Sequence, residues 1–136
     1  LPKGFAAFFE SLSSAVMHST AMPPAHAAAV LKLLERLPLL DAERARLRDN
    51  AVFFRARLCE LGIPTRGTAH IVAVPTGGEA RTTHLGEQLA ERGVLALAAR
   101  YPTVPHGDGL LRFGLTALHT QGMLERTARL LADLWG

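Results

Sequence analysis

The apolar residues of this chain change their spacing near Gly62, and this change limits the fold more than any other feature. Before Gly62 they recur every three or four residues, as they do along one face of a helix. After it, the run 71–74 (IVAV) is β-prone, and from Leu111 to Ala117 apolar residues alternate with small or polar ones. The chain therefore combines helices with strands, which excludes an all-α and an all-β fold.

Turn and capping residues divide the chain into expected elements. Asp41 and Thr120 are candidate N-caps, and the prolines and glycines of residues 101–109 indicate an irregular loop. Helices are predicted at 5–17, 24–37, 41–61, 79–92 and from 120 onward, and strands at 71–74, 94–98 and 111–117. This order predicts an α+β fold, in which a small, mostly antiparallel sheet has helices packed on one side.

The composition is typical of one folded domain or of part of a larger protein. Of 136 residues, 49% are apolar and 20% charged, which excludes a disordered tail. No apolar run approaches the roughly 18 residues of a membrane span, and no cleavable signal sequence opens the chain. The single cysteine, Cys59, excludes an internal disulfide and favours a reducing, cytoplasmic location.

Charge and histidine patterns argue against two further kinds of site. The net charge is +3, but the four acids of residues 41–60 nearly balance the five arginines there, and no aromatic platform interleaves with them. A solvated helix face is therefore favoured over a nucleic-acid interface. The six histidines show no metal-ligand spacing, so no metal site is expected.

Two positions carry a chemical signal of their own. Ser19 and Thr20 place two hydroxyls just before Pro23 and Pro24, where a helix start can bind an anion; an ordinary N-cap is the alternative. Arg112 points away from the core side of its expected strand and follows the irregular loop. It is placed to hold a carboxylate through a bidentate contact, and a solvent-facing arginine is the alternative.

These two segments resemble the C-terminal domain of the α-oxoamine synthases, which are pyridoxal-phosphate enzymes of fold type I. The resemblance rests on residues 19–25 (STAMPPA), 100–107 (RYPTVPHG), 111–113 (LRF) and 119–120 (HT), and it covers nearly the whole chain. It implies that residues 1–136 are the C-terminal small domain, with 1–17 as a connecting helix. The large cofactor domain is then absent from this chain.

The resemblance also implies roles for particular residues. The hydroxyls of Ser19 and Thr20 would bind the phosphate of pyridoxal 5'-phosphate across a homodimer interface. Arg112 would bind the carboxylate of the amino-acid substrate, and Thr103 would belong to the loop that lines the substrate site. The full protein would condense an amino acid with an acyl-CoA. A fold-type-I aminotransferase, or a non-catalytic interaction module with the same fold, is the alternative.

Two positions depart from the family pattern. Leu110 stands where these proteins usually have the first arginine of an Arg-hydrophobic-Arg strand, which leaves the acyl partner open. Lys3 and Lys32 are the only lysines, and neither has the small, polar surroundings expected of a Schiff-base lysine. That catalytic lysine is therefore expected upstream of Leu1, and the isolated chain is expected to be inactive.

Overall fold

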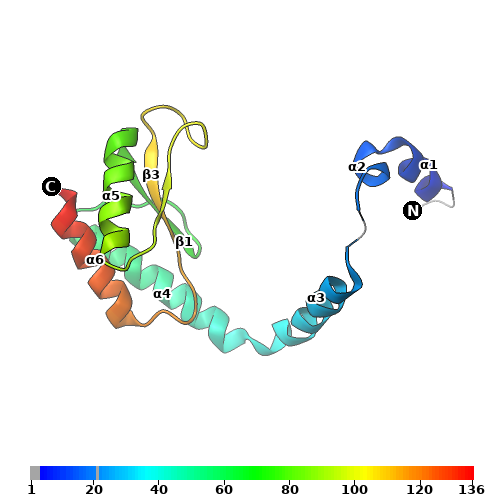
Figure 1. The fold of residues 1–136 in the computed structure, drawn as a ribbon. Helices are drawn as coiled ribbons and strands as arrows, with labels where there is room; N and C mark the ends of the chain where they lie inside the picture. Colours follow the sequence, from blue (N-terminus) through cyan, green and yellow to red (C-terminus); the bar gives the residue numbers. More distant parts are fainter. Residues whose placement is uncertain (1–3, 21) are drawn as a thin grey trace. The chain divides into compact units, whose positions relative to one another are not determined.

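The structure, a computed structural model, describes residues 4–20 and 22–136, and it divides the chain into two units (Figure 1). Unit 1 comprises Leu1–Leu40, and unit 2 comprises Asp41–Gly136.

Unit 1 consists of short helices. They are α1 (Phe5–Leu12), α2 (Ser14–Met17), α3 (Pro24–Arg36) and the 3₁₀ turn η1 (Leu37–Leu39). The predicted single helix at 5–17 is wrong, because the backbone of Ser13 is extended (φ −85°, ψ 107°) and separates α1 from α2. The predicted helix at 24–37 is confirmed, and Pro38 in η1 cannot donate the hydrogen bond that would continue it.

The helices of unit 1 bury none of their described residues. Large apolar side chains stay exposed on α1 and α3, with Phe8 at 60%, Leu12 at 68% and Leu31 at 61%. Helical stability in proteins comes mostly from packing an apolar face against another surface. Unit 1 therefore gains little stability from burial within itself. Among the residues that the structure describes, no helix is both long and apolar enough to cross a membrane.

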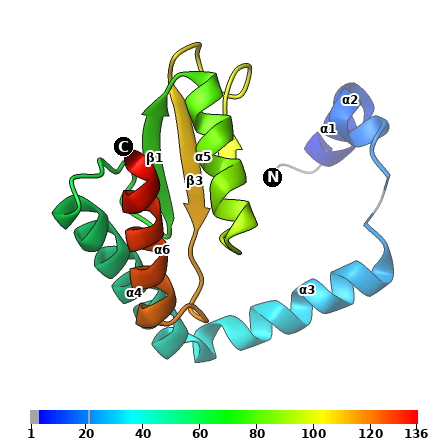
Figure 2. The same ribbon diagram turned by 60° about the vertical axis from the view of Figure 1, so that its left-hand side comes forward.

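Unit 2 is a three-stranded antiparallel sheet with helices on one face (Figure 2). Its elements are α4 (Asp41–Glu60), β1 (Ile71–Gly77), α5 (Glu79–Glu91), β2 (Leu97–Ala99), β3 (Gly109–Gly114) and α6 (Gln121–Trp135). The strands lie in the order β1-β3-β2. Helix α5 packs on all three strands, and α4 packs on β1 and α6. The predicted α+β fold class is confirmed.

The core lies between the sheet and the helices. Burial alternates along the strands, so that Val72 and Val74 of β1 and Leu111 and Phe113 of β3 face the helices and are buried. The ring of Phe54 on α4 meets the ring of Phe113 edge to face, with 5.4 Å between the centroids. The helical spacing of apolar residues predicted for 41–61 is confirmed, since Ala51, Phe54 and Leu58 follow it on α4 and are all buried, with Leu47 and Leu61 partly buried beside them.

Some boundaries differ from those that the sequence predicts. The strand expected at 94–98 begins only at Leu97, because the N–H of Val94 donates to the carbonyl of Leu89 (2.9 Å) and so closes the end of α5. Asp41 is the first residue of α4 rather than its N-cap. The predicted cap at Thr120 is confirmed, since its hydroxyl accepts the N–H of Met123 at 3.3 Å.

An ion-pair cluster joins α4 to α6. The guanidinium of Arg57 donates to both carboxylate oxygens of Glu125, at 2.6 and 2.7 Å, and Arg129 donates to one of them at 2.6 Å. The hydrogen bonds from Arg57, and then those from Arg129, lower the pKa of Glu125 to about 2.

This pKa predicts that unit 2 loses stability in acid. A carboxyl group whose pKa is lower in the folded state stabilises the fold above its unfolded pKa of 4.5 and loses that contribution as the pH falls toward the folded value of about 2. We expect the urea midpoint of the wild type to fall between about pH 5 and pH 2. The Glu125→Gln variant should show a shallower fall over this range. Identical pH dependence in the two proteins would contradict the assignment to Glu125.

Candidate functional site

The face of the sheet that the helices leave open carries Arg112. The strand register places Arg112 of β3 between Ala73 of β1 and Leu97 of β2. Its side chain is exposed, as the alternation predicts. Within residues 4–20 and 22–136, no hydrogen bond or ion pair engages its guanidinium group. The five N–H donors of this group therefore face solvent from a rigid strand that is paired on both sides.

The neighbours of Arg112 on this face are apolar. Leu110, two residues earlier on β3, is paired with Pro75 of β1 and with Ala99 of β2. The adjoining positions of the sheet thus supply no carboxylate that would neutralise the guanidinium. An arginine in such surroundings suits a planar anion, because its fork of donors matches the two oxygens of a carboxylate.

The loop between β2 and β3 begins beside Leu110, where Ala99 ends β2, and Thr103 is exposed on it. The rings of Tyr101 and His106 stack at 3.8 Å between centroids. Glu79, at the start of α5, accepts the N–H of Gly107 at 3.2 Å and lies 3.2 Å from Nδ1 of His106. Its own backbone N–H, and then these two contacts, lower the pKa of Glu79. The loop is therefore held to α5 by an ionised carboxylate.

Gly109 sets the point at which this loop becomes β3. A Cβ atom on Gly109 would lie 2.1 Å from Oγ1 of Thr82 and 2.6 Å from the carbonyl oxygen of Gly77, so only glycine fits. The hydroxyls of Thr76 and Thr82 form a buried hydrogen bond of 2.6 Å beside it. Sequence reasoning missed this contact, and it assigned Gly109 to the loop because an isolated glycine is a turn signal.

Asn50 supports the turn that follows β3. Its side-chain amide is buried and donates to the carbonyl oxygens of Thr116 (3.1 Å) and His119 (2.8 Å). Nδ1 of His119 in turn accepts the N–H of Thr116 at 3.1 Å. These contacts connect α4 directly to the segment between β3 and α6.

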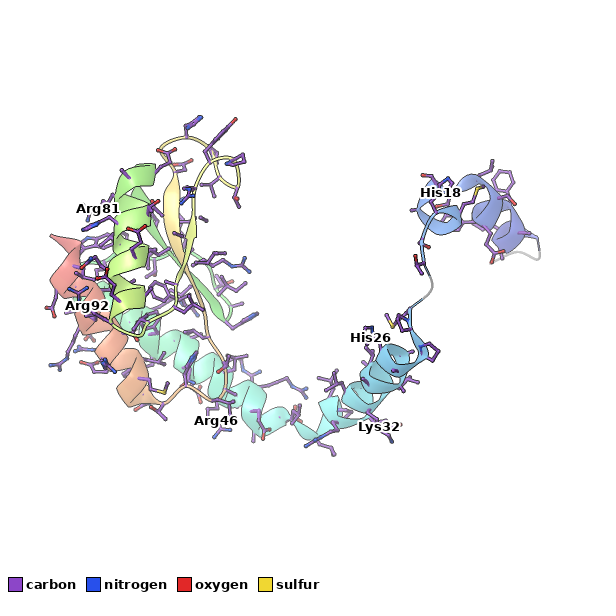
Figure 3. All side chains as sticks on the ribbon, viewed as in Figure 1. His18, His26, Lys32, Arg46, Arg81 and Arg92 are labelled. Carbon is purple, nitrogen blue, oxygen red and sulfur yellow. The ribbon has the colours of Figure 1, made fainter. Side chains whose placement is uncertain are left out.

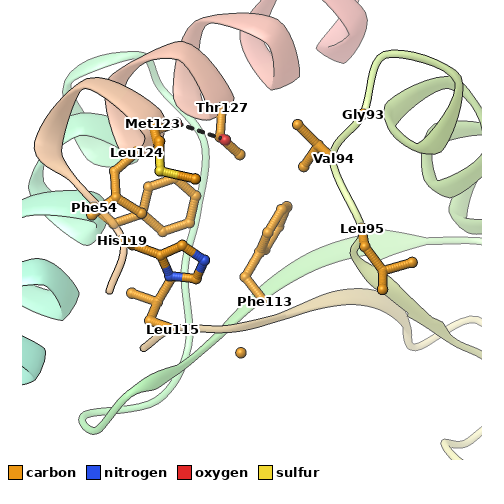
Figure 4. Close-up of a pocket in the computed structure, with 11 residues that line it drawn as sticks. Phe54, Gly93, Val94, Leu95, Phe113, Leu115, His119, Met123, Leu124 and Thr127 are labelled. Carbon is orange, nitrogen blue, oxygen red and sulfur yellow. Dashed lines mark hydrogen bonds between the residues drawn. The ribbon is translucent and has the colours of Figure 1, made fainter. Parts of the chain in front are cut away.

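His119 also lines a pocket of about 200 Å³ beside the start of α6 (Figure 4). Its wall is mixed, with the apolar side chains of Phe54, Val94 and Phe113 beside the polar His119 and Thr127. Phe113 belongs to the helix-covered face of the sheet, whereas Arg112 lies on the open face. This pocket is therefore separate from the candidate carboxylate site.

Ser19 and Thr20 lie in unit 1, on the segment between α2 and α3, and both are exposed. The interpretation of either residue as an N-cap is wrong, since Pro23 occupies that position of α3. Pro23 and Pro24 also lack N–H groups, so the first positions of α3 offer fewer donors to an anion than an ordinary helix start does. Two adjacent hydroxyls still fit phosphate oxygens as donors, although they supply no positive charge.

Lys32 is not placed as a reactive amine. It lies on α3 (Figure 3). Its side chain is 79% exposed and forms an ion pair with Glu35 at 2.8 Å. Lys3 lies outside the described residues. The position of the Schiff-base lysine stays a prediction.

Comparison with known proteins agrees with this architecture. The model of the family "aminotransferase class I and II" matches residues 5–131. The chain belongs to this family. It is 38% identical over 124 residues to 8-amino-7-oxononanoate synthase of Gluconacetobacter diazotrophicus, a match that covers 90% of this chain and 31% of the relative. The chain spans about a third of the length of the curated relatives it matches.

Solved structures show the same fold in this family. The chain superimposes on 8-amino-7-oxononanoate synthase of Francisella tularensis with a TM-score of 0.79, at 22% identity, over 96% of this chain and 38% of the other. It superimposes on serine palmitoyltransferase of S. paucimobilis with bound PLP with a TM-score of 0.85, at 23% identity, over 98% of this chain and 34% of the other. The resemblance to the α-oxoamine synthases is confirmed, and pyridoxal phosphate is the cofactor of this aminotransferase family.

Proposed function

We propose that this chain is the C-terminal small domain of a cytoplasmic pyridoxal-phosphate-dependent acyltransferase, which condenses an amino acid with an acyl-CoA. The observation that carries the proposal is the unpaired guanidinium of Arg112 on the open, apolar face of the sheet. The named relatives, 8-amino-7-oxononanoate synthase and serine palmitoyltransferase, support this reaction class. Residues 1–17 then connect to a large domain outside this chain, which supplies the Schiff-base lysine.

In this proposal Arg112 binds the carboxylate of the amino acid and fixes the orientation of its α-carbon. The cofactor, when bound, supplies the electron sink for chemistry at that carbon. Thr103 contributes to the wall of the substrate site from the loop before β3. Ser19 and Thr20 donate hydrogen bonds to the cofactor phosphate across a homodimer interface. Each of these residues binds or orients, and none of them transfers a proton.

The exposed apolar helices of unit 1 support a role in assembly. Phe8 and Leu12 of α1 and Leu31 of α3 are all more than half exposed. Apolar surface of this kind marks an interface more often than it marks solvated surface. We place the large domain or the second subunit of a homodimer against it.

The test of this function uses the longer protein that contains the chain, with added pyridoxal phosphate. Release of free thiol from an acyl-CoA, dependent on a small amino acid, is the expected result. An aminotransferase would instead pass the amino group to a 2-oxo acid and release no thiol, and a non-catalytic module would do neither. Either of these outcomes would contradict the proposal.

The roles of Ser19 and Thr20 predict a defect in cofactor retention. The Ser19→Ala, Thr20→Val double variant removes two donors to a charged acceptor, each worth about 1.5–3 kcal/mol when well placed. We expect the Kd for pyridoxal phosphate to rise by about 100-fold or more in an absorbance titration of the longer protein. With saturating cofactor, amino-acid kinetics should be close to those of the wild type. Ser14→Ala, at another exposed serine of unit 1, is the control and should bind cofactor normally.

A further inference from the structure

The arginines of α4 lie on different sides of the helix. Along the sequence, the acids of this helix nearly cancel their charge, but the structure shows that the acids do not neutralise both sides equally. Arg57 forms ion pairs with Glu125 of α6 and with Glu60 of α4, which neutralise its charge. Arg44, Arg48 and Arg55 recur at spacings that place them along one side of the helix. This side therefore has its own charge, which the near-neutral total for residues 41–60 conceals.

These three arginines rim a pocket of about 350 Å³ in unit 2. Its apolar part is formed by Leu47 and Val52 on α4, and Val52 is 62% exposed. The segment that leads into β1 forms the other wall and adds His70 to the rim. No acidic residue lines this pocket. Positive charge from α4 thus borders an apolar depression.

The charges at the rim are held in place but only partly neutralised. Arg55 donates to the carbonyl oxygens of Ala69 (2.7 Å) and Thr68 (3.1 Å), neutral partners that fix its guanidinium without cancelling its charge. Arg44 pairs with Asp41 at 2.5 Å. Arg48 is exposed, and no ion pair to it is found among the residues that the structure describes. A net positive potential therefore remains over the pocket.

We propose that this pocket binds a small anion that carries a short apolar chain. The anionic head, a phosphate or a carboxylate, contacts Arg48 and Arg55, and the chain covers Leu47 and Val52. Charge complementarity selects the head, and burial of apolar surface selects the chain. The pocket shares no residue with the open face around Arg112. The inference therefore stands whether or not the proposed function holds.

The test is a titration of the full ¹⁵N-labelled chain, followed by amide chemical shifts. Hexyl phosphate and hexanoate are the amphipathic probes, and inorganic phosphate and 1-hexanol supply the head or the chain alone. We expect saturable shifts at residues 44–55 and 66–70, with at least one amphipathic probe binding five- to tenfold more tightly than either partial probe. The tighter of the two identifies the head group. Equal binding of all four probes, or shifts confined to residues 5–39, would overturn the proposal.

Variants of exposed residues provide the second arm of this test. Arg48→Ala should weaken the binding of the preferred probe about five- to tenfold, as expected for one charge-assisted contact at a partly exposed site. Val52→Asp should weaken it further, because it places a negative charge in the apolar part. Arg46→Ala is the matched control (Figure 3). Arg46 is exposed on α4 but does not line this pocket, so its loss should leave the affinity unchanged. Equal affinities in Arg48→Ala and Arg46→Ala would overturn the proposal.

Discussion

Replacing Arg112 by alanine in the longer enzyme will lower kcat/KM for the amino acid by roughly 30- to 1000-fold. The change removes a bidentate, charge-assisted contact to the substrate carboxylate, worth on the order of 2–4 kcal/mol when largely desolvated. The effect should be large because neither residue paired with Arg112, Ala73 or Leu97, carries a charge, and the next arginine in this row, Arg66, lies beyond Ala73. Steady-state kinetics with varied amino acid measure it directly.

Two comparisons separate a substrate role from a structural one. Arg112→Lys should restore only part of the activity, because a point charge cannot reproduce the planar fork of donors. The Kd for the cofactor should hardly change in either variant, in contrast to the Ser19→Ala, Thr20→Val protein. Wild-type amino-acid kinetics in Arg112→Ala would show that this arginine is merely solvated, and the proposed carboxylate site would then be wrong.

Replacing Gly109 by alanine will destabilise unit 2 by about 3 kcal/mol. The new Cβ would lie 2.1 Å from Oγ1 of Thr82 and 2.6 Å from a backbone oxygen, so either β3 or α5 must move. Overpacking of this kind costs about 1–3 kcal/mol, and loss of the buried Thr76–Thr82 hydrogen bond adds about 1–3 kcal/mol. The Tm of the chain should fall by roughly 10–20 °C in a thermal melt.

Gly78→Ala is the matched control for Gly109→Ala. Gly78 lies two residues after Thr76, and no atom lies within 4 Å of the position where its Cβ would be built. Its backbone angles (φ −64°, ψ 150°) are accessible to alanine. Its Tm should stay within a few degrees of the wild type. A similar loss of stability in both variants would show that the cost lies in the turn and not in the contact with Thr82.

Helical periodicity predicted the long elements of unit 2 well. The stripe through Phe54 and Leu58 specified which face of α4 is buried, and Thr120 marked the start of α6. Both signals are local, since a helix forms its hydrogen bonds within its own segment. The outward direction of Arg112 could be predicted for the same reason, because side chains alternate along any strand.

The sequence predicted less well the ends of elements that depend on pairing or packing with another part of the chain. Residues 94–98 look β-prone throughout, yet β2 starts at Leu97, where pairing with Arg112 begins. Residues 5–17 look like one helix, yet the extended backbone of Ser13 divides them. The edge strand β2 extends only as far as its neighbour β3 offers hydrogen bonds. The segment 5–17 buries none of its described residues in a helix, so no packing keeps it as one continuous helix.

By itself, the sequence determined the fold class, the family resemblance and the identity of Ser19, Thr20, Thr103 and Arg112 as candidates, because residue type and spacing carry that information. Only the tertiary structure decided what surrounds them. The strand register gave Arg112 its apolar neighbours, and helix packing neutralised Arg57 while leaving Arg48 exposed. The energy of a charge depends on the groups that lie within a few ångströms of it, and those groups come from distant parts of the chain.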